Sequence, residues 1–299
     1  MQGQGGILKA TKAPRPIVLA VFSDLHCGSR VGLCPPEGVR LDDGQIVLPS
    51  KGQQWLWDQY NRFKAAVLLA TMRTKLRAKD PELWLLCNGD AVEGQHHGTT
   101  QVMAPGKDAQ HYIAKETFLL WKSLKPARLI ITRGTEAHVG QSGTDEEALA
   151  HSLKMEGLPV VRDPVTELWS HWRVLLNLHG RTIDAQHHGK GITGLPWTKE
   201  GAVARLAFRI WVEHTRLGWR APDVAIRSHL HHAYDSYDAH PTRLIGTPSF
   251  QLKTSHAHNA VPEAINHVGG VIITSVPGEP LVIDKCIYRP EAPEPLIEV

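Results

Sequence analysis

The stretch Pro16-Ile-Val-Leu-Ala-Val-Phe22, which runs directly into Ser23-Asp24-Leu25-His26, says most about the fold of this chain. Seven apolar residues bounded by polar ones predict a buried β-strand. Side chains two positions apart on an extended chain point the same way, so Asp24 and His26 can bind one cation. Carboxylate and imidazole ligands without clustered cysteines suit Mn, Fe, Zn or a mixed pair.

The same layout returns downstream. The strand-like runs 83–87, 128–132 and 223–227 each end in acids or histidines. In chain order these are Asp90 and Glu93, Glu136 and His138, and His229 and His231. Many of the 18 histidines lie at such ends, including His187 and His188 after residues 181–186. Because loops at the carboxyl ends of strands converge on one crevice in open α/β sheets, we expect these side chains to share a site.

The remaining pattern predicts the architecture. Apolar spacings of three and four predict helices over 52–79, 107–124 and 199–217, and another that begins at Thr144 and ends near Gly157. Further strands are expected at 159–163, 172–178, 181–186, 242–245, 271–275 and 281–288. Strands first alternate with helices and then follow one another, which predicts an α/β fold of two packed mixed β-sheets flanked by helices. We expect one domain over 16–299, preceded by a tail over 1–15.

Composition excludes several classes of protein. The chain has 299 residues, 42% of them hydrophobic and 21% charged, which is ordinary for a globular protein. No apolar run approaches the roughly 20 residues of a membrane span, and the first 15 residues lack a signal core. We therefore expect a cytoplasmic protein without a membrane partner. The four cysteines are scattered along the sequence, which predicts free thiols. The net charge of +3 is too small to indicate a nucleic-acid partner by itself.

Taken in order, these segments resemble the motif series of the calcineurin-like metallophosphoesterases. That series is Asp-x-His, Gly-Asp-x-x-[acid or His]-Gly, Gly-Asn-His, an isolated His, and Gly-His-x-His. Here it reads Asp24-Leu-His26, Gly89-Asp90-Ala-Val-Glu93-Gly94, Gly134-Thr-Glu-Ala-His138, His187-His188 and Ser228-His229-Leu-His231. The resemblance spans about residues 17 to 231 and implies a four-layer sandwich, helix–sheet–sheet–helix.

The resemblance also implies a site for two divalent metal ions, with Mn expected first and Fe, Zn, Ni or Mg as alternatives. Asp24, His26 and His231 would hold the first ion and Asp90 would bridge both. His229 and one of the His187–His188 pair, with His187 preferred, would hold the second. A hydroxide shared by the ions would attack phosphorus in line with the leaving oxygen.

The third motif departs from the family series, because Thr135, Glu136 and Ala137 stand where Asn is expected. We expect Glu136 to supply an oxygen to the second metal and His138 to assist the leaving group as general acid. Two alternatives stay open: Thr135 takes the place of Asn and binds weakly, or His138 is itself the ligand.

Three further residues are candidates for substrate binding. His97 lies in the loop that follows the Gly-Asp motif, and His188 neighbours the expected ligand His187. Lys190 lies in a Gly-rich loop, where backbone N–H groups can also bind an anion.

The Gly-Asp motif contains no arginine, the residue that binds a dianionic monoester bidentately in the protein-phosphatase branch. We therefore expect a phosphodiesterase that acts on nucleotides or on nucleic acid. Backbone contacts could come from Arg30, Arg40, Lys107, Arg133 and Lys190. A phosphomonoesterase, either nucleotide or protein phosphatase, and a non-catalytic metal- or phosphate-binding scaffold are the alternatives. The oligomeric state is left open.

Overall fold

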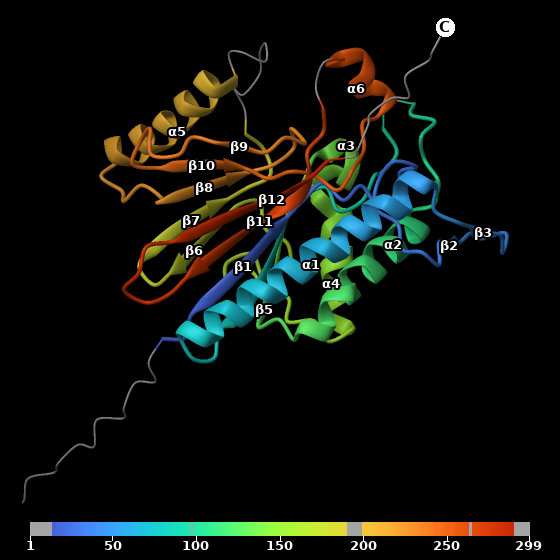
Figure 1. The fold of residues 1–299 in the computed structure, drawn as a ribbon. Helices are drawn as coiled ribbons and strands as arrows, with labels where there is room; N and C mark the ends of the chain where they lie inside the picture. Colours follow the sequence, from blue (N-terminus) through green and yellow to red (C-terminus); the bar gives the residue numbers. More distant parts are fainter. Residues whose placement is uncertain (1–13, 97, 190–198, 263–264, 290–299) are drawn as a thin grey trace, which may run out of the picture.

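The computed structural model describes residues 14–96, 98–189, 199–262 and 265–289. Within them, two five-stranded mixed sheets pack face to face, with helices on the outer face of each (Figure 1). The predicted α/β architecture of two packed mixed sheets flanked by helices is confirmed. The expectations for His97 and Lys190 lie outside the described residues.

The first sheet has the order β12-β11-β1-β4-β5. Strands β1 (Ile17–Phe22), β4 (Glu82–Asn88) and β5 (Arg128–Thr132) are parallel. Strands β11 (Val268–Ser275) and β12 (Val282–Tyr288) continue the sheet antiparallel on the other side of β1. Every residue of β1 is buried, which explains its uninterrupted apolar sequence, since both faces of this central strand are covered.

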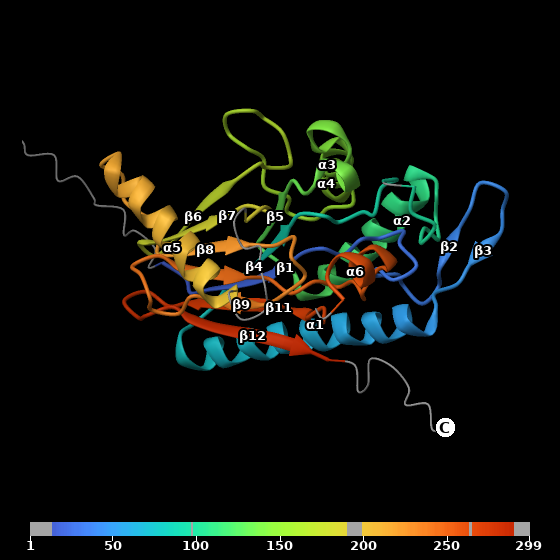
Figure 2. The ribbon, with the colours of Figure 1, turned by 90° about the horizontal axis from the view of Figure 1, so that it is seen from above.

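The second sheet has the order β6-β7-β8-β10-β9. Strands β7 (Arg181–Ala185), β8 (Val224–Arg227) and β10 (Arg243–Gly246) are parallel. The antiparallel edges are β6 (Val174–Leu178) and the short β9 (Tyr234–Asp235). A separate hairpin, β2 (Val39–Arg40) and β3 (Ile46–Val47), extends from the body (Figure 2).

Helices complete the four layers. Helices α1 (Lys51–Arg77), α2 (Lys107–Leu119) and α4 (Thr144–Met155) cover the first sheet, and α5 (Lys199–Arg216) covers the second. Shorter helical pieces are η1 (Leu120–Leu124), α3 (Glu136–Val139), η2 (Gln141–Gly143) and α6 (Ser255–Ala260). None of the helices among the described residues is apolar over a length that would cross a membrane.

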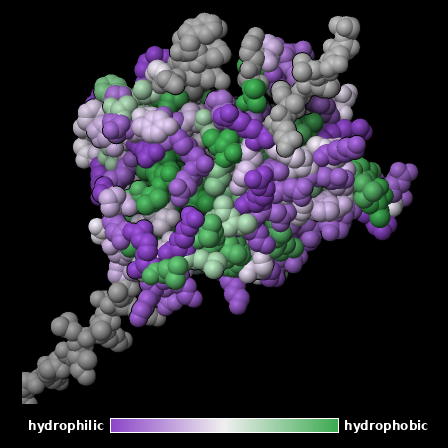
Figure 3. All heavy atoms as spheres, viewed as in Figure 1, coloured by the Kyte–Doolittle hydropathy of each residue, from purple (hydrophilic) through white to green (hydrophobic). Residues whose placement is uncertain are grey.

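The apolar core has three parts that follow these layers. One lies between the two sheets, and the others lie between each sheet and its helices. In the largest, the rings of Phe22 and Trp121 stack with centroids 5.5 Å apart, and the Trp121 indole donates to the Tyr60 hydroxyl. Polar side chains cover most of the face seen in Figure 3, with apolar groups scattered among them.

Most predicted elements are present, and the differences have physical causes. Helix α1 begins one residue before its predicted start, because Ser50 and Gln53 form a reciprocal capping box. Residues 159–163 form only a single bridge, Val160 to Leu129, because prolines at 159 and 164 cannot donate to a strand ladder. Strand β9 was not predicted, since two residues are too few to show a pattern.

Candidate metal centre

Predicted ligands from three distant segments meet at one edge of the sandwich. Asp24 and His26 follow β1, Asp90 follows β4, and His229 and His231 follow β8. Backbone hydrogen bonds join the first two loops, from Asp24 N to Gly89 O at 2.9 Å and from His26 N to Asp90 O at 3.1 Å. The His229 N–H donates to Asp24 Oδ2 at 3.4 Å, which connects the two sheets at this edge.

These five residues share an uncommon backbone conformation. All have positive φ: Asp24 at 52°, His26 at 47°, Asp90 at 54°, His229 at 74° and His231 at 50°. Such angles cost on the order of 1 kcal/mol or more at a residue with a side chain, and they cluster at functional sites. The surrounding fold holds these strained residues in place, which points to a role for their side chains.

Asp24, His26 and His231 form a first group of converging donor atoms, all within 4.8 Å of one another. Nε2 of His231 lies 3.2 Å from Nε2 of His26 and 3.3 Å from Asp24 Oδ1. This Oδ1 atom is buried and makes no hydrogen bond within the described residues, whereas Oδ2 accepts from the Ser23 hydroxyl at 2.6 Å. Because an unsatisfied buried carboxylate oxygen is costly, the group fits a bound divalent cation.

A second group lies beside the first and shares Asp24 with it. Asp24, Asp90 and His187 offer atoms within 4.8 Å of one another, as do His187, His188 and His229. His187 Nε2 is 2.9 Å from Asp90 Oδ2 and 3.9 Å from Asp24 Oδ1. The two groups therefore form one continuous cluster of carboxylates and imidazoles.

Hydrogen bonds to fixed acceptors set the tautomers of three histidines. Nδ1 of His187 lies 2.7 Å from Asn88 O, and Nδ1 of His138 lies 2.8 Å from Glu93 O. A carbonyl oxygen only accepts, so each Nδ1 carries the proton. Nδ1 of His26 likewise faces the Glu93 carboxylate, at 2.9 Å. Once such a ring is neutral, its lone pair therefore lies on Nε2, the usual arrangement in metal-binding histidines.

The third motif requires a correction. Glu136 is the exposed first residue of α3, and it joins none of the candidate ligand groups among the described residues. Thr135, just before the helix, lies where the third motif of the family series has Asn. Its hydroxyl lies 3.1 Å from Asp90 Oδ2, 3.3 Å from His187 Nε2 and 3.2 Å from His229 Nδ1. Glu136 is exposed at the start of α3, and the Thr135 hydroxyl, not the Glu136 carboxylate, contacts the other candidate ligands.

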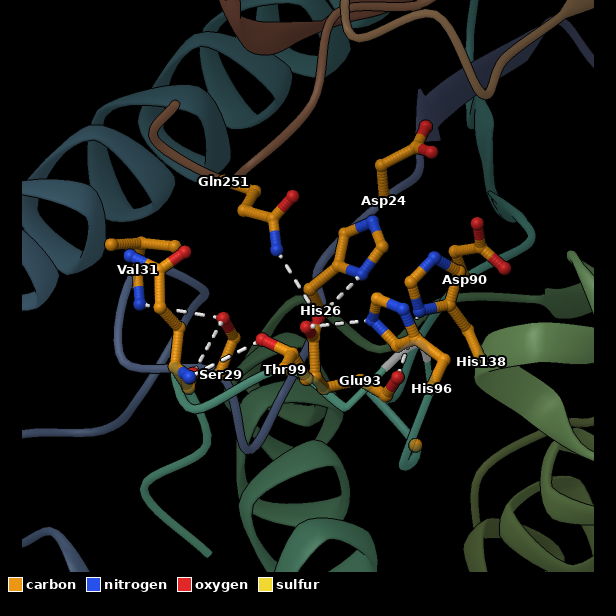
Figure 4. Close-up of polar contacts among 12 residues, drawn as sticks. Asp24, His26, Ser29, Val31, Asp90, Glu93, His96, Thr99, His138 and Gln251 are labelled. Carbon is orange, nitrogen blue, oxygen red and sulfur yellow. Dashed lines mark hydrogen bonds and ion pairs between the residues drawn. The ribbon is translucent and has the colours of Figure 1, made fainter. Parts of the chain in front are cut away.

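Glu93 organises the histidines on the cleft side of the cluster (Figure 4). One carboxylate oxygen contacts His26 and accepts from the Gln251 amide at 3.2 Å, while the other lies 3.1 Å from His96 Nε2. The His138 ring packs edge-on against His26 and His96, at centroid distances of 4.5 and 4.2 Å. His138 therefore lies beside the candidate metal ligands, and His96 lies next to it.

His188 also lies at the cluster, with its ring centroid 4.8 Å from that of His229. Unlike His187, it is only partly buried. The expectation that it contacts substrate remains a prediction, and its membership of a candidate ligand group keeps a metal-binding role open.

Two buried residues that we did not select hold the strand ends together. Glu146, at the start of α4, accepts from Gly134 N at 2.6 Å and Ala91 N at 3.2 Å, and so ties two motif loops to each other. Asn88 donates to Gln186 O and to the Ser228 hydroxyl, which links β4 to the second sheet. Nothing in the local sequence around either residue indicates this longer-range role.

Burial and mutual charge perturb the cluster strongly. Burial acts to raise the pKa of Asp24, but the charges of His231 and His187 prevail and lower it to about 2. For His187, burial acts to lower the pKa, but Asp90 and Asp24 raise it to about 10. Burial and the nearby His187 charge lower the pKa of His229 to about 4, which keeps that ring neutral. A proton on His187 thus compensates two carboxylates that a divalent cation would compensate better.

A large cavity opens from the cluster. Its volume is about 1170 Å³, and its lining includes His26, Asp90, His138, His229 and His231. Further lining comes from the loop around residues 99–101, from residues 232–237 and from α6. A ligand much larger than phosphate can therefore reach the candidate ligands.

No protein-family model matches the chain, and a search of curated proteins found no significant match. Among solved structures, Vacuolar Protein Sorting 29 from Cryptosporidium parvum is 10% identical, with 92% of this chain and 99% of that chain covered and a TM-score of 0.38. A metallophosphoesterase from Sphaerobacter thermophilus is 12% identical, with 91% and 89% covered and a TM-score of 0.32. The sulfate thiohydrolase SoxB from Thermus thermophilus is 9% identical, with 91% and 57% covered and a TM-score of 0.35.

Likenesses of this size say nothing about ligand or reaction, so we base the function on this chain's own residues. In the order of its motifs and in its two packed mixed sheets, the chain resembles the calcineurin-like metallophosphoesterases.

Proposed function

We propose that this protein is a two-metal-dependent phosphoester hydrolase that acts on phosphodiesters. The observation that carries the proposal is the adjoining pair of ligand groups, Asp24–His26–His231 and Asp24–Asp90–His187, assembled from four strand ends. Acids and imidazoles packed this closely need cations to compensate them. Two adjacent ions are the usual means of hydrolysing phosphoesters with such ligands.

In this proposal, Asp24, His26 and His231 hold the first ion, and His187 and His229 hold the second, with Asp90 between them. The bound ions, Mn by preference, would act as Lewis acids toward the phosphoryl oxygens and lower the pKa of a water. Glu93 and Asn88 O keep the rings of His26 and His187 in the required tautomer. Asn88 therefore acts through its backbone as well as through its side chain.

His138 is the candidate for assisting the leaving group. Its Nδ1–H is held by Glu93 O, so Nε2 is the nitrogen available to substrate. Burial and the nearby His26 lower the pKa of His138 to about 4, which disfavours its protonated form in the free protein. The negative charge of a bound phosphodiester acts in the opposite direction and favours the proton that a leaving alkoxide needs.

A phosphodiester is favoured over a phosphomonoester because no arginine lines the cavity among the described residues. Arg227, next to the ligand loop, is buried, and its guanidinium is held by Asp184 at 2.7 Å. A dianionic monoester would gain from a bidentate arginine, which the described lining of this cavity does not supply. A phosphomonoesterase is therefore the second candidate.

A non-catalytic scaffold is the alternative from another class. Thr135 at the Asn position is the observation that favours it, because a neutral hydroxyl is a weak ligand and the second ion would then be held loosely. Metal content separates the two possibilities. Two ions per chain with turnover support the enzyme, and one ion or none without turnover supports the scaffold.

The test is Mn-stimulated hydrolysis of bis-(p-nitrophenyl) phosphate by the wild type and by Asp90→Asn, with metal content measured on both. We expect Asp90→Asn to abolish turnover and to weaken binding of both ions, since Asp90 is the proposed bridging ligand. Glu136→Gln, an exposed carboxylate near the same site, is the matched control and should retain activity. Near-wild-type turnover in Asp90→Asn would refute the proposal.

A further inference from the structure

The cavity beside the metal centre extends well beyond the space that a phosphate needs. Its volume of about 1170 Å³ lies just above the volumes of pockets that enclose a small organic ligand, roughly 300–1000 Å³. A substrate that uses this space carries an organic group on at least one side of the scissile phosphate.

Few cations line that space. Among the described residues of the lining, Lys285 is the one lysine or arginine. Its ammonium lies 2.9 Å from Asp235 Oδ2 and 3.3 Å from the Tyr237 hydroxyl, and Asp235 also binds Arg243 bidentately. This small ion cluster leaves at most one net positive charge at the cavity wall.

Of the basic residues expected to contact a nucleic-acid backbone, Lys190 lies outside the described residues, and the other four are engaged elsewhere or lie apart. Arg133 is buried, donates to Ser142 O and the Ser170 hydroxyl, and packs over Trp172. Lys107 binds Asp145 through both carboxylate oxygens. Neither lines the cavity, and the same is true of Arg30 and Arg40. Proteins that hold a single strand instead provide a groove of cations that follows its phosphates.

Away from the metal centre and this ion cluster, the described lining contains hydroxyl, amide and apolar groups beside His232 and His256. Thr99, Gln101, Thr254 and Asn266 offer hydroxyl and amide groups, and Leu230, Val261 and Ile265 offer apolar surface. Val261 and Ile265 are 51% and 54% exposed, so apolar surface is available at the rim of the cavity. Such a lining suits an uncharged organic group with a few hydrogen-bonding atoms.

We propose that the cavity selects a small phosphodiester with one neutral organic group of about nucleoside size, and not a nucleic-acid strand. This inference rests on the proposed phosphodiesterase function and narrows its substrate class. In this proposal, the metal centre binds the scissile phosphate, and the cavity wall binds the neutral organic group. Additional phosphates along a strand would find no row of cations among the described residues of the cavity wall.

Two substrates with the same leaving group test the inference. Thymidine 5′-(p-nitrophenyl phosphate) carries one diester, and the same ester at the 5′ end of an eight-residue oligothymidylate adds seven more. We expect kcat/KM for the oligonucleotide ester to equal or fall below that of the mononucleotide. A value at least about tenfold higher, decreasing steeply with added KCl, would overturn the inference. Hydrolysis of neither ester by protein with both ions bound would overturn the proposed function as well.

A binding measurement gives a second readout that does not depend on turnover. Titration of the protein with the methyl-ester counterparts, whose poor leaving group makes hydrolysis negligible, should show no gain in affinity from the extra nucleotides. The logarithm of the oligonucleotide binding constant should change little with the logarithm of salt concentration. A slope of about −2 or steeper would indicate several phosphate contacts and contradict the inference.

A matched pair of variants tests the electrostatic reason. Ala257 on α6 lines the cavity, whereas Ala260 on the same helix is exposed and does not. Ala257→Lys should raise kcat/KM of the oligonucleotide ester about threefold or more relative to the mononucleotide ester. Ala260→Lys should leave that ratio unchanged. An equal effect of both variants, or none from Ala257→Lys, would count against the cavity wall as the origin of selectivity.

Discussion

At the scale of single residues, the position of Thr135 has the clearest chemical consequence. Its hydroxyl lies within 3.3 Å of side-chain atoms of Asp90, His187 and His229. The family that the chain resembles has the amide oxygen of an Asn at this position. A neutral hydroxyl is a weak donor to a divalent ion. The second ion is therefore expected to bind more weakly than the first.

Thr135→Asn should restore the amide ligand and tighten the second site about tenfold. Thr135→Val, which keeps the shape and removes the hydroxyl, should weaken that site by a similar factor. Calorimetric titration of metal-free protein with Mn²⁺ measures both steps of binding. If Thr135→Val binds the second ion as tightly as the wild type, Thr135 is not a ligand.

His138→Ala should lower hydrolysis about 100-fold for substrates with a poor leaving group, because general acid catalysis contributes about 10²–10⁴-fold. The loss should be smallest with nitrophenolate, which needs little protonation. A series of diesters that differ only in leaving-group pKa measures this dependence. An equal loss across the series would assign His138 to positioning.

The ligands proposed after β1, β4 and β8 could be predicted from sequence, because each follows the end of its strand by two to four residues. Glu136 was the expected ligand of the third motif, but it is exposed where α3 begins, and the Thr135 hydroxyl contacts the cluster instead. Glu146 could not be found, because its partners, Gly134 and Ala91, are backbone groups of two other loops.

At the scale of elements, Glu146 connects α4 to the loops after β4 and β5. Burial raises the pKa of its carboxyl to about 8, and the charge of Asp90 adds to the shift. Between the ordinary value of 4.5 and about 8, the folded state thus binds more protons than the unfolded state. The free energy of unfolding therefore falls as pH rises through this window.

Glu146→Gln should flatten this dependence, because the amide does not titrate and still accepts the Gly134 N–H. In metal-free protein, the wild type should lose on the order of 1–3 kcal/mol more than the variant between pH 5 and pH 8. Urea unfolding at several pH values measures this difference in the free energy of unfolding, with Glu136→Gln as the exposed control. Parallel profiles for wild type and Glu146→Gln would show that this carboxyl is not perturbed as described.

Long elements were easier to predict than short ones. Helix α1 and strand β1 have enough residues for their apolar spacing to be read directly. Strand β9 and helix α3 depend on contacts with distant segments, since two and four residues bury too little surface to form alone. Such short elements line the site, so its details follow from tertiary structure.

At the scale of the whole molecule, the sandwich brings together loops that are up to about 200 residues apart in sequence. The first sheet supplies Asp24, His26 and Asp90, and the second supplies His187, His229 and His231. The site therefore exists only where the two sheets meet. The order of the motifs along the chain predicted that these loops converge. The directions of the individual strands in the structure determine which side chains face one another.

Anomalous scattering from a crystal of this protein soaked with Mn²⁺ tests the proposed metal centre most directly. We expect two peaks about 3.5–4 Å apart on either side of the Asp90 carboxylate. One should lie against Asp24, His26 and His231, and the other against His187 and His229. A crystal in which no ion binds between these side chains, or in which Mn²⁺ occupies only sites away from Asp90, would contradict the account.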